Sequence, residues 1–217
     1  MCIRDRMLAE SDKKDLGCHT GTISDAFLEL YQAGKLTNAH KELDTGLSAW
    51  NLAMGSQELY DWLDAEPQLF HPGDLDYIHS VERISKFSNV ISINGGVQLD
   101  LMGQENAEST GTRQLSGVGG QMDFLEGAYR SKGGKGFICI NSSRVTKDGE
   151  RKSNILATIP GGSTISAPRT MIQYVATEYG IASLSGKTLR ERAEAMASIA
   201  HPDFREELMK YAQENFK

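Results

Sequence analysis

The densest glycine cluster in the sequence lies in residues 116–121 (SGVGGQ), just before a predicted helix. Glycines allow backbone N–H groups to approach a ligand closely, and the N-terminus of the following helix favours negative charge. Such a loop suits a phosphate or an oxyanion forming on a thioester carbonyl, and it suits a plain strand-to-helix turn equally well. It is not a P-loop, because no Gly-Lys-Ser/Thr follows, and position 122 lacks the third glycine of a GxGxxG fingerprint.

Glutamates that follow predicted strands form a second set of candidates. Glu105 and Glu108 come just after a strand expected at 97–102, and Glu178 follows one expected at 171–177. Ligand-facing groups of open α/β sheets lie beyond the carboxyl ends of the strands, so these positions favour a role at a site. A solvated or capping glutamate is the commoner alternative.

Histidine and cysteine offer less chemistry. His19 follows Cys18 directly, and neighbours on an extended segment point to opposite sides, which argues against a Cys–His dyad. The remaining histidines show no metal-ligand spacing, so the sequence predicts no metal site. Three cysteines without CxxC spacing indicate reduced thiols and a cytoplasmic protein.

Strand patterns and helix patterns alternate along the chain. Helices are predicted at 24–33, 57–65 and 121–129, and two more near the C-terminus, capped by Thr188 with Glu191 and by Asp203 with Glu206. Strands are predicted at 49–54, 89–94, 97–102, 136–140, 155–159 and 171–177. This alternation predicts an α/β fold with an open, mainly parallel sheet and helices on both faces.

Length and composition exclude several classes of protein. The 217 residues are 39% hydrophobic and 24% charged, as in an ordinary globular chain. A net charge of −6 without a Lys/Arg block argues against nucleic-acid binding. No apolar run is long enough to span a membrane or to serve as a secretory signal. Residues 1–6 (MCIRDR) continue no pattern and precede a second methionine, Met7, so we expect a non-native leader.

Five segments, taken in order, resemble the C-terminal half of the acetyl-CoA hydrolase/transferase family, close to the 4-hydroxybutyrate and butyryl/acetate CoA-transferases. They are residues 15–20 (DLGCHT), 99–104 (LDLMGQ), 116–124 (SGVGGQMDF), 177–182 (TEYGIA) and 199–204 (IAHPDF). The resemblance implies that residues 7–217 form the family's C-terminal domain, that its N-terminal half is missing, and that the fold is of the CoA-transferase (NagB/RpiA-like) type.

The resemblance also implies a reaction. Members of the family attack an acyl-CoA thioester with a glutamate carboxylate, pass through an acyl anhydride and a glutamyl-CoA thioester, and hand CoA to a second carboxylate such as acetate. Acyl-CoA and a small carboxylate are then the partners, together with the missing N-terminal half and further copies in a homo-oligomer. No cofactor is expected to be bound permanently, since coenzyme A is a substrate.

Site residues follow from the same resemblance. Gly117, Gly119, Gly120 and Gln121 match a segment that lines the CoA site, and we expect that Gly119 or Gly120 leaves no room for a side chain. Two further contacts with CoA are expected, one at the strand end formed by Gly95 and Gly96 and one between Lys135 and a CoA phosphate.

The sequence departs from the family at Gly21. The related transferases read His-Thr/Ser-Glu where this chain reads His19-Thr20-Gly21, and that glutamate is their nucleophile. Glycine has no side chain, so the usual covalent route cannot pass through this position. Three alternatives remain: another carboxylate (Glu108 or Glu178) serves instead, the protein is an acyl-CoA hydrolase that activates water, or it is a non-catalytic CoA-binding relative.

Overall fold

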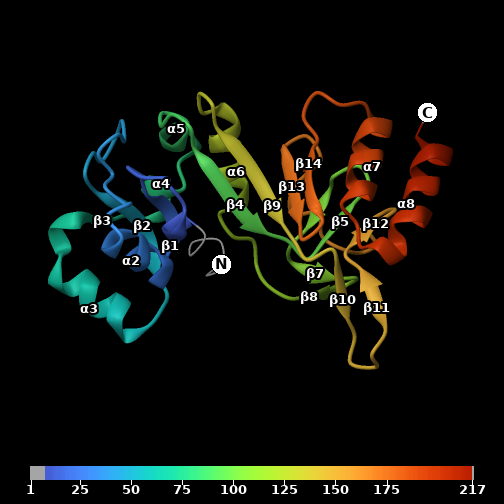
Figure 1. Ribbon diagram of the computed structural model, residues 1–217, viewed down its shortest axis with the longest axis horizontal. Helices are drawn as coiled ribbons and strands as arrows, with labels where there is room; N and C mark the ends of the chain where they lie inside the picture. The colour runs from blue at the N-terminus through green and yellow to red at the C-terminus, as the bar shows by residue number, and fades with distance from the viewer. Residues whose placement is uncertain (1–7, 217) are drawn as a thin grey trace. The chain divides into compact units, whose positions relative to one another are not determined.

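A computed structural model describes residues 8–216, and they form two compact units that are considered separately (Figure 1). Unit 1 runs to Val90 and includes Ser131–Gly133, whereas unit 2 comprises Ile91–Arg130 and the chain from Gly134 onward. The leader predicted at residues 1–6 lies outside the described residues. No helix between residues 8 and 216 is long and apolar enough to cross a membrane.

Unit 1 is built on a three-stranded parallel sheet in the order β1-β2-β3. Its elements are β1 (His19–Ile23), α2 (Asp25–Gln32), β2 (Ser48–Ala53), α3 (Gln57–Ala65), a 3-10 turn (Pro67–Leu69), β3 (Phe70–Pro72), α4 (Leu75–Ile78) and α5 (Val81–Ile84). The register pairs Ala49 with both His19 and His71, so these three side chains project from one face of the sheet.

The apolar side chains of α3 pack into a core of unit 1 together with Ile23, Leu28 and Phe70. Leu59 and Trp62 are buried, and Trp62 packs edge-on against Phe70 with ring centroids 4.8 Å apart. The predicted N-cap is present, because the Ser56 hydroxyl accepts a hydrogen bond from the Leu59 N–H. Ser24 precedes α2 as predicted, but its side chain makes no capping bond.

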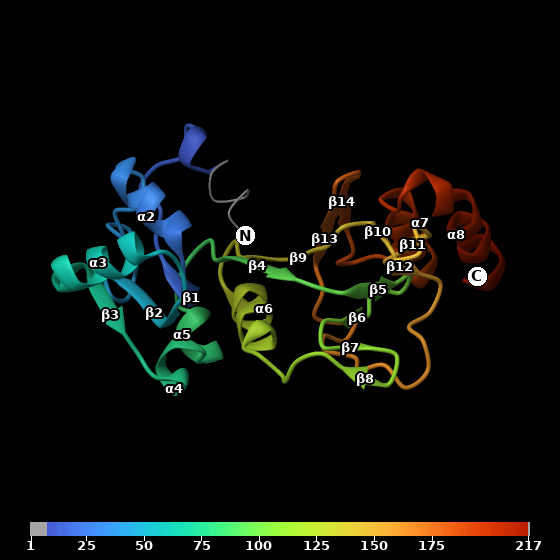
Figure 2. The same cartoon turned by 90° about the horizontal axis from the view of Figure 1, so that it is seen from below.

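Unit 2 contains a four-stranded sheet in the order β14-β13-β9-β4. β4 (Ile91–Gly95), β9 (Lys135–Cys139) and β13 (Tyr174–Thr177) are parallel, and the edge strand β14 (Gly180–Ser183) is antiparallel to β13. α6 (Gln121–Arg130) connects β4 to β9 and packs against both, which Figure 2 shows from below. A helical crossover of this kind is what parallel strands require.

Smaller elements complete unit 2. A second sheet joins β12 (Ile155–Leu156), β5 (Gln98–Asp100) and β6 (Glu105–Asn106), and two hairpins pair β7 (Ser109–Thr110) with β8 (Arg113–Gln114) and β10 (Ser143–Val145) with β11 (Arg151–Ser153). α7 (Leu189–Ser198) and α8 (Pro202–Asn215) pack against each other at the C-terminus (Figures 1 and 2).

Arg192 ties α7 to the rest of unit 2. Its guanidinium is buried and donates to the carbonyls of Met102, Leu184 and Arg169 at 2.7–2.8 Å. Gly103 has φ +86°, and a Cβ there would lie 2.7 Å from the Arg192 Nη2. The guanidinium therefore satisfies three carbonyls that otherwise lack a donor, and it fits only because residue 103 is glycine.

The predicted α/β class and mainly parallel pairing are confirmed. The boundaries of several elements differ, however: β12 covers only the first two residues of the strand predicted at 155–159, before a turn at Pro160–Ser163, and β13 begins three residues late. The predicted cap at Asp203 is wrong. His201 caps α8, its Nδ1 accepting from the Asp203 N–H at 3.3 Å, and Pro202 takes the first helical position. The capping box at Thr188 and Glu191 is present as predicted.

Replacing Arg192 by Met should destabilise unit 2 strongly. The substitution leaves three carbonyls without a donor, and we expect the free energy of unfolding to fall by about 3 kcal/mol. Arg190→Met on the same helix is the matched control, because Arg190 is exposed and forms only an i,i+4 pair with Glu194. Urea unfolding followed by far-UV circular dichroism compares the two variants, and equal midpoints would show that the buried guanidinium contributes nothing.

Candidate functional site

Three parallel strands of unit 2 end at the same edge of their sheet. Gly95 at the end of β4 pairs with Cys139 at the end of β9, and Cys139 pairs with Ala176 in β13. The segments that follow these strands, beginning at Gly96 and including Glu178, therefore emerge side by side, as ligand-binding segments do in open α/β sheets.

Lys135 lies at the other end of β9. It is exposed and pairs with Ile91 at the start of β4. Four residue steps along a strand put it about 13 Å from Cys139. The structure thus brings Gly95, Gly96 and Glu178 to one edge and places Lys135 away from them.

Both oxygens of Glu178 are engaged by Ser142. The Ser142 N–H donates to Oε2 at 2.9 Å, and its hydroxyl donates to Oε1 at 2.5 Å. Burial opposes ionisation of this carboxyl, but the two bonds outweigh that effect and hold its pKa below the usual value. Glu178 is therefore a fixed carboxylate that joins the segments after β9 and β13.

No described part of the chain packs against Gly117 or Gly119 in the glycine loop before α6. Gly117 and Gly119 are exposed, and a Cβ at either would meet no described atom within 4 Å. Of the two glycines expected to leave no room for a side chain, Gly119 is therefore not restricted by this chain, and the expectation for Gly120 stays a prediction.

Glu105 is buried, which its position after a predicted strand does not indicate. It is completely buried in β6, and its Oε2 accepts a hydrogen bond from the Gln121 side chain at the start of α6. A Cβ at Gly96 would lie 2.5 Å from Oε1, so the turn after β4 passes directly against this carboxyl. Glu108, the neighbouring candidate, is also buried and accepts from Gln114 Nε2 at 3.5 Å.

In unit 1, Gly21 lies in the middle of β1. Thr20 pairs with Trp50 and Thr22 with Leu52, which sets Gly21 beside Asn51 of β2. Side chains alternate along a strand, so position 21 faces the same side of the sheet as His19. Whatever occupies position 21 therefore shares a face with the His19 imidazole.

The His19 imidazole is neutral and fixed. Its Nε2–H donates to the Ile78 carbonyl at 2.8 Å, and its ring packs against Phe87. Burial lowers the pKa of His19 to about 4, even though the bond to the carbonyl favours the charged form. The segment that carries Ile78 thereby fixes the orientation of the His19 ring on this face of β1.

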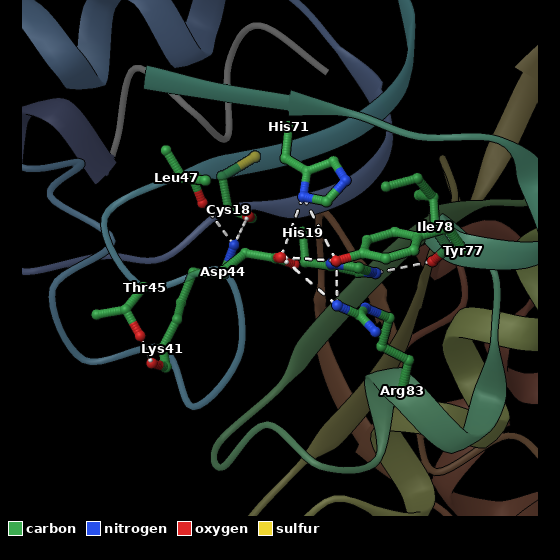
Figure 3. A network of polar contacts seen from close by, with 10 residues as sticks. All are labelled: Cys18, His19, Lys41, Asp44, Thr45, Leu47, His71, Tyr77, Ile78 and Arg83. Atoms are coloured by element: carbon green, nitrogen blue, oxygen red, sulfur yellow. Dashed lines mark hydrogen bonds and ion pairs between the residues drawn. The ribbon is translucent and has the colours of Figure 1, made fainter. Parts of the chain in front are cut away.

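A cluster of polar side chains holds that segment in place (Figure 3). Asp44 Oδ1 accepts from Tyr77 at 2.7 Å, from His71 Nδ1 at 3.1 Å and from Arg83 Nη2 at 3.5 Å. The Arg83 guanidinium lies 3.6 Å from the centre of the Tyr77 ring. Burial of Asp44 opposes ionisation, but the Tyr77 bond and the nearby cations hold its pKa below the usual value.

Lys41 fixes the start of β1 from the other side. Its ammonium donates to the carbonyls of Cys18 and Leu47 at 2.8 and 2.6 Å (Figure 3). A Cβ at Gly17 would lie 2.9 Å from the Lys41 Cγ. Burial raises the pKa of the Cys18 thiol to about 12, so this cysteine is no nucleophile. Within residues 8–216, no group of three His, Cys, Asp or Glu side chains is placed to hold a metal ion.

Comparison with known proteins gives consistent matches. The model of the acetyl-CoA hydrolase/transferase C-terminal domain matches residues 55–212. Butyryl-CoA:acetate CoA-transferase of Anaerostipes caccae is 45% identical over 95% of this chain and 46% of its own length, and 4-hydroxybutyrate coenzyme A transferase of Clostridium kluyveri is 43% identical over 97% and 48%.

Solved structures agree with these matches. The crystal structure of RipA from Yersinia pestis has a TM-score of 0.88 and 37% identity, covering 98% of this chain and 46% of that one. This chain thus spans about half the length of the relatives it matches. By the extent of the domain match and the identity to these relatives, it belongs to the acetyl-CoA hydrolase/transferase family.

Proposed function

We propose that the protein to which this domain belongs moves CoA between an acyl-CoA and a short-chain carboxylate such as acetate. The observation that carries the proposal is the identity of more than 40% with two transferases over nearly the whole chain. The names of those relatives differ in the carboxylate and share the exchange of CoA.

The glycine loop and the Gly95–Gly96 turn are the proposed contacts for CoA. The loop leads into α6, a ten-residue helix whose N-terminus favours an anion or a developing oxyanion. Exposed glycines at 117 and 119 let the ligand reach the backbone amides directly. Lys135, at the other end of β9, would meet only a distant part of the long CoA molecule, such as a phosphate.

CoA transfer by the family's route needs a carboxylate nucleophile. Gly21 supplies no carboxylate, so transfer requires another one, and Glu108 and Glu178 are the candidates we propose. Both oxygens of Glu178 already accept from Ser142, which would have to release one of them. The second candidate function, hydrolysis of acyl-CoA by an activated water, is favoured by Gly21 itself. A relative that binds CoA without chemistry is the third.

The remaining proposals concern the whole protein. It works with an N-terminal half of the family, forms a homo-oligomer, resides in the cytoplasm and keeps no permanently bound cofactor. Mass spectrometry after exposure to acyl-CoA separates the three functions. A covalent CoA–glutamyl adduct supports transfer, release of free CoA without an adduct supports hydrolysis, and unchanged bound acyl-CoA supports a binding role.

Gly119→Val should abolish CoA binding and leave the fold intact. A side chain at 119 meets no described atom of this chain, so only the approach of a ligand to the loop is blocked. Losing one or two amide bonds to a charged group costs about tenfold or more in affinity. Calorimetry with CoA measures the loss, and Gly161→Val, which also adds a side chain in open space, is the matched control. Unchanged affinity of Gly119→Val would make the loop a turn only.

Gly21→Glu should create or raise transferase activity in a chain joined to the family's N-terminal half. The new carboxylate would project from the His19 face of β1, where the family resemblance expects the nucleophile. Gly21→Gln has nearly the same size and no charge, so a gain with Glu and none with Gln assigns the nucleophile to position 21. The opposite result is strong transfer with Gly21 in place that disappears on replacing Glu108 or Glu178.

A further inference from the structure

Glu105 is held rigidly by its own backbone. Its N–H donates to the Ala167 carbonyl at 3.0 Å, and its carbonyl accepts from the Ser166 N–H at 2.8 Å. On the other side it pairs with Leu99 of β5. Leu99 and Ala167 are fully buried, so the backbone of Glu105 is held between two buried segments.

The carboxyl of Glu105 contacts both glycine segments of unit 2. Oε2 accepts from the side chain of Gln121, the residue that ends the glycine loop and begins α6. On the other side, the turn at Gly96 approaches so closely that a Cβ would lie 2.5 Å from Oε1 and 3.1 Å from Ile140. Oε1 itself has no hydrogen-bond partner among the described atoms.

This setting disfavours a negative charge. Burial raises the pKa of Glu105 to about 8, the bond from Gln121 opposes that rise, and the charge of Glu108 adds to it. Glu108 is the charged group that acts on the carboxyl, while the paired residue Leu99 and Ala167 are apolar; Asp100, also on β5, is held by Gln104 through its two carboxylate oxygens. Near neutral pH the carboxyl of Glu105 is therefore mostly uncharged.

We propose that Glu105 is a positioning residue. Its uncharged carboxyl packs against the Gly96 turn and accepts a hydrogen bond from Gln121, the first residue of α6, and this tie between the two segments is lost, and the glycine loop freed, when the carboxyl loses its proton. A buried carboxylate next to Glu108 gains hydration only if neighbouring chain moves away. The loop at 117–119 is exposed, and a Cβ at Gly117 or Gly119 would meet no described atom within 4 Å, so this segment is free to move. The part of the inference that concerns ligand binding rests on the proposed function, because the loop is the proposed contact for CoA.

Amide hydrogen exchange of the 217-residue chain tests the tie without any ligand. Protection factors, corrected for the intrinsic pH dependence of exchange, are measured for peptides covering 95–98 and 119–124 at pH 7.0 and 9.5. Between the ordinary pKa of an exposed glutamate and the raised pKa of the closed form, each pH unit shifts the balance toward the open form about tenfold, and above the raised pKa the shift levels off. We therefore expect protection to fall by roughly tenfold between the two pH values. A wild-type chain with constant protection in both peptides overturns the proposal, and this measurement needs no variant.

Two variants assign the effect to Glu105. Glu105→Gln keeps the shape and the bond to Gln121 but cannot ionise, so its protection should stay constant between the two pH values. Glu108→Gln is the matched control and should keep the fall, displaced to lower pH, because the Glu108 charge that raises the pKa of Glu105 is gone. A parallel fall in wild type and Glu105→Gln overturns the proposal, whatever Glu108→Gln does.

Binding of desulfo-CoA, which lacks the titrating thiol, then separates this inference from the proposed function. Wild type should bind it roughly tenfold more weakly at pH 9.5 than at pH 7.0, whereas Glu105→Gln should bind equally at both. If no variant binds at either pH while exchange behaves as expected, the proposed CoA site fails and the tie stands. If wild type and Glu105→Gln lose affinity in parallel, Glu105 does not position the loop for its ligand, and the inference is wrong.

Discussion

Parallel pairing of β9 with both β4 and β13 is the constraint on which unit 2 depends. It places the ends of three strands at one edge, and the segments that follow have to find their hydrogen-bond partners there. The bonds from Ser142 to Glu178 join two of these segments. Glu105, which contacts Gly96 on one side and Gln121 on the other, joins the third to α6. The edge is thus organised by two carboxyl groups in opposite states, one a hydrogen-bonded carboxylate and one mostly protonated.

In unit 1, side chains fix the segments around β1 by donating hydrogen bonds to backbone carbonyls. Lys41 and His19 both direct their N–H groups at main-chain oxygens, so the buried cation and the neutral imidazole fix loops rather than one another. Asp44 adopts a left-handed backbone conformation, φ 52°, and this turns its carboxylate toward three donors from later in the chain. A strained residue of this kind is retained where the surrounding contacts fix it, and these contacts lie beside β1.

Local patterns predicted most of the fold, and non-local contacts account for what they missed. The helix at 57–65 and the capping box at Thr188 depend on neighbours in sequence, so both are where the sequence indicates. The glycine loop and the strand end at Gly95 were also recognisable. The burial of Glu105 was not, because Ala167 and Gly96 enclose it from distant parts of the chain. By local pattern alone it is one more glutamate after a strand.

The residue at position 21 can change without loss of the frame around it. The bonds that fix β1 come from the His19 ring, from the Cys18 carbonyl and from pairing with β2, and none of them uses a side chain at 21. These hydrogen bonds therefore do not depend on which residue stands at position 21. A carboxylate there would stand on the same face of the sheet as the neutral His19 imidazole. With Gly21, unit 1 keeps the imidazole on this face of the sheet and presents no carboxylate beside it.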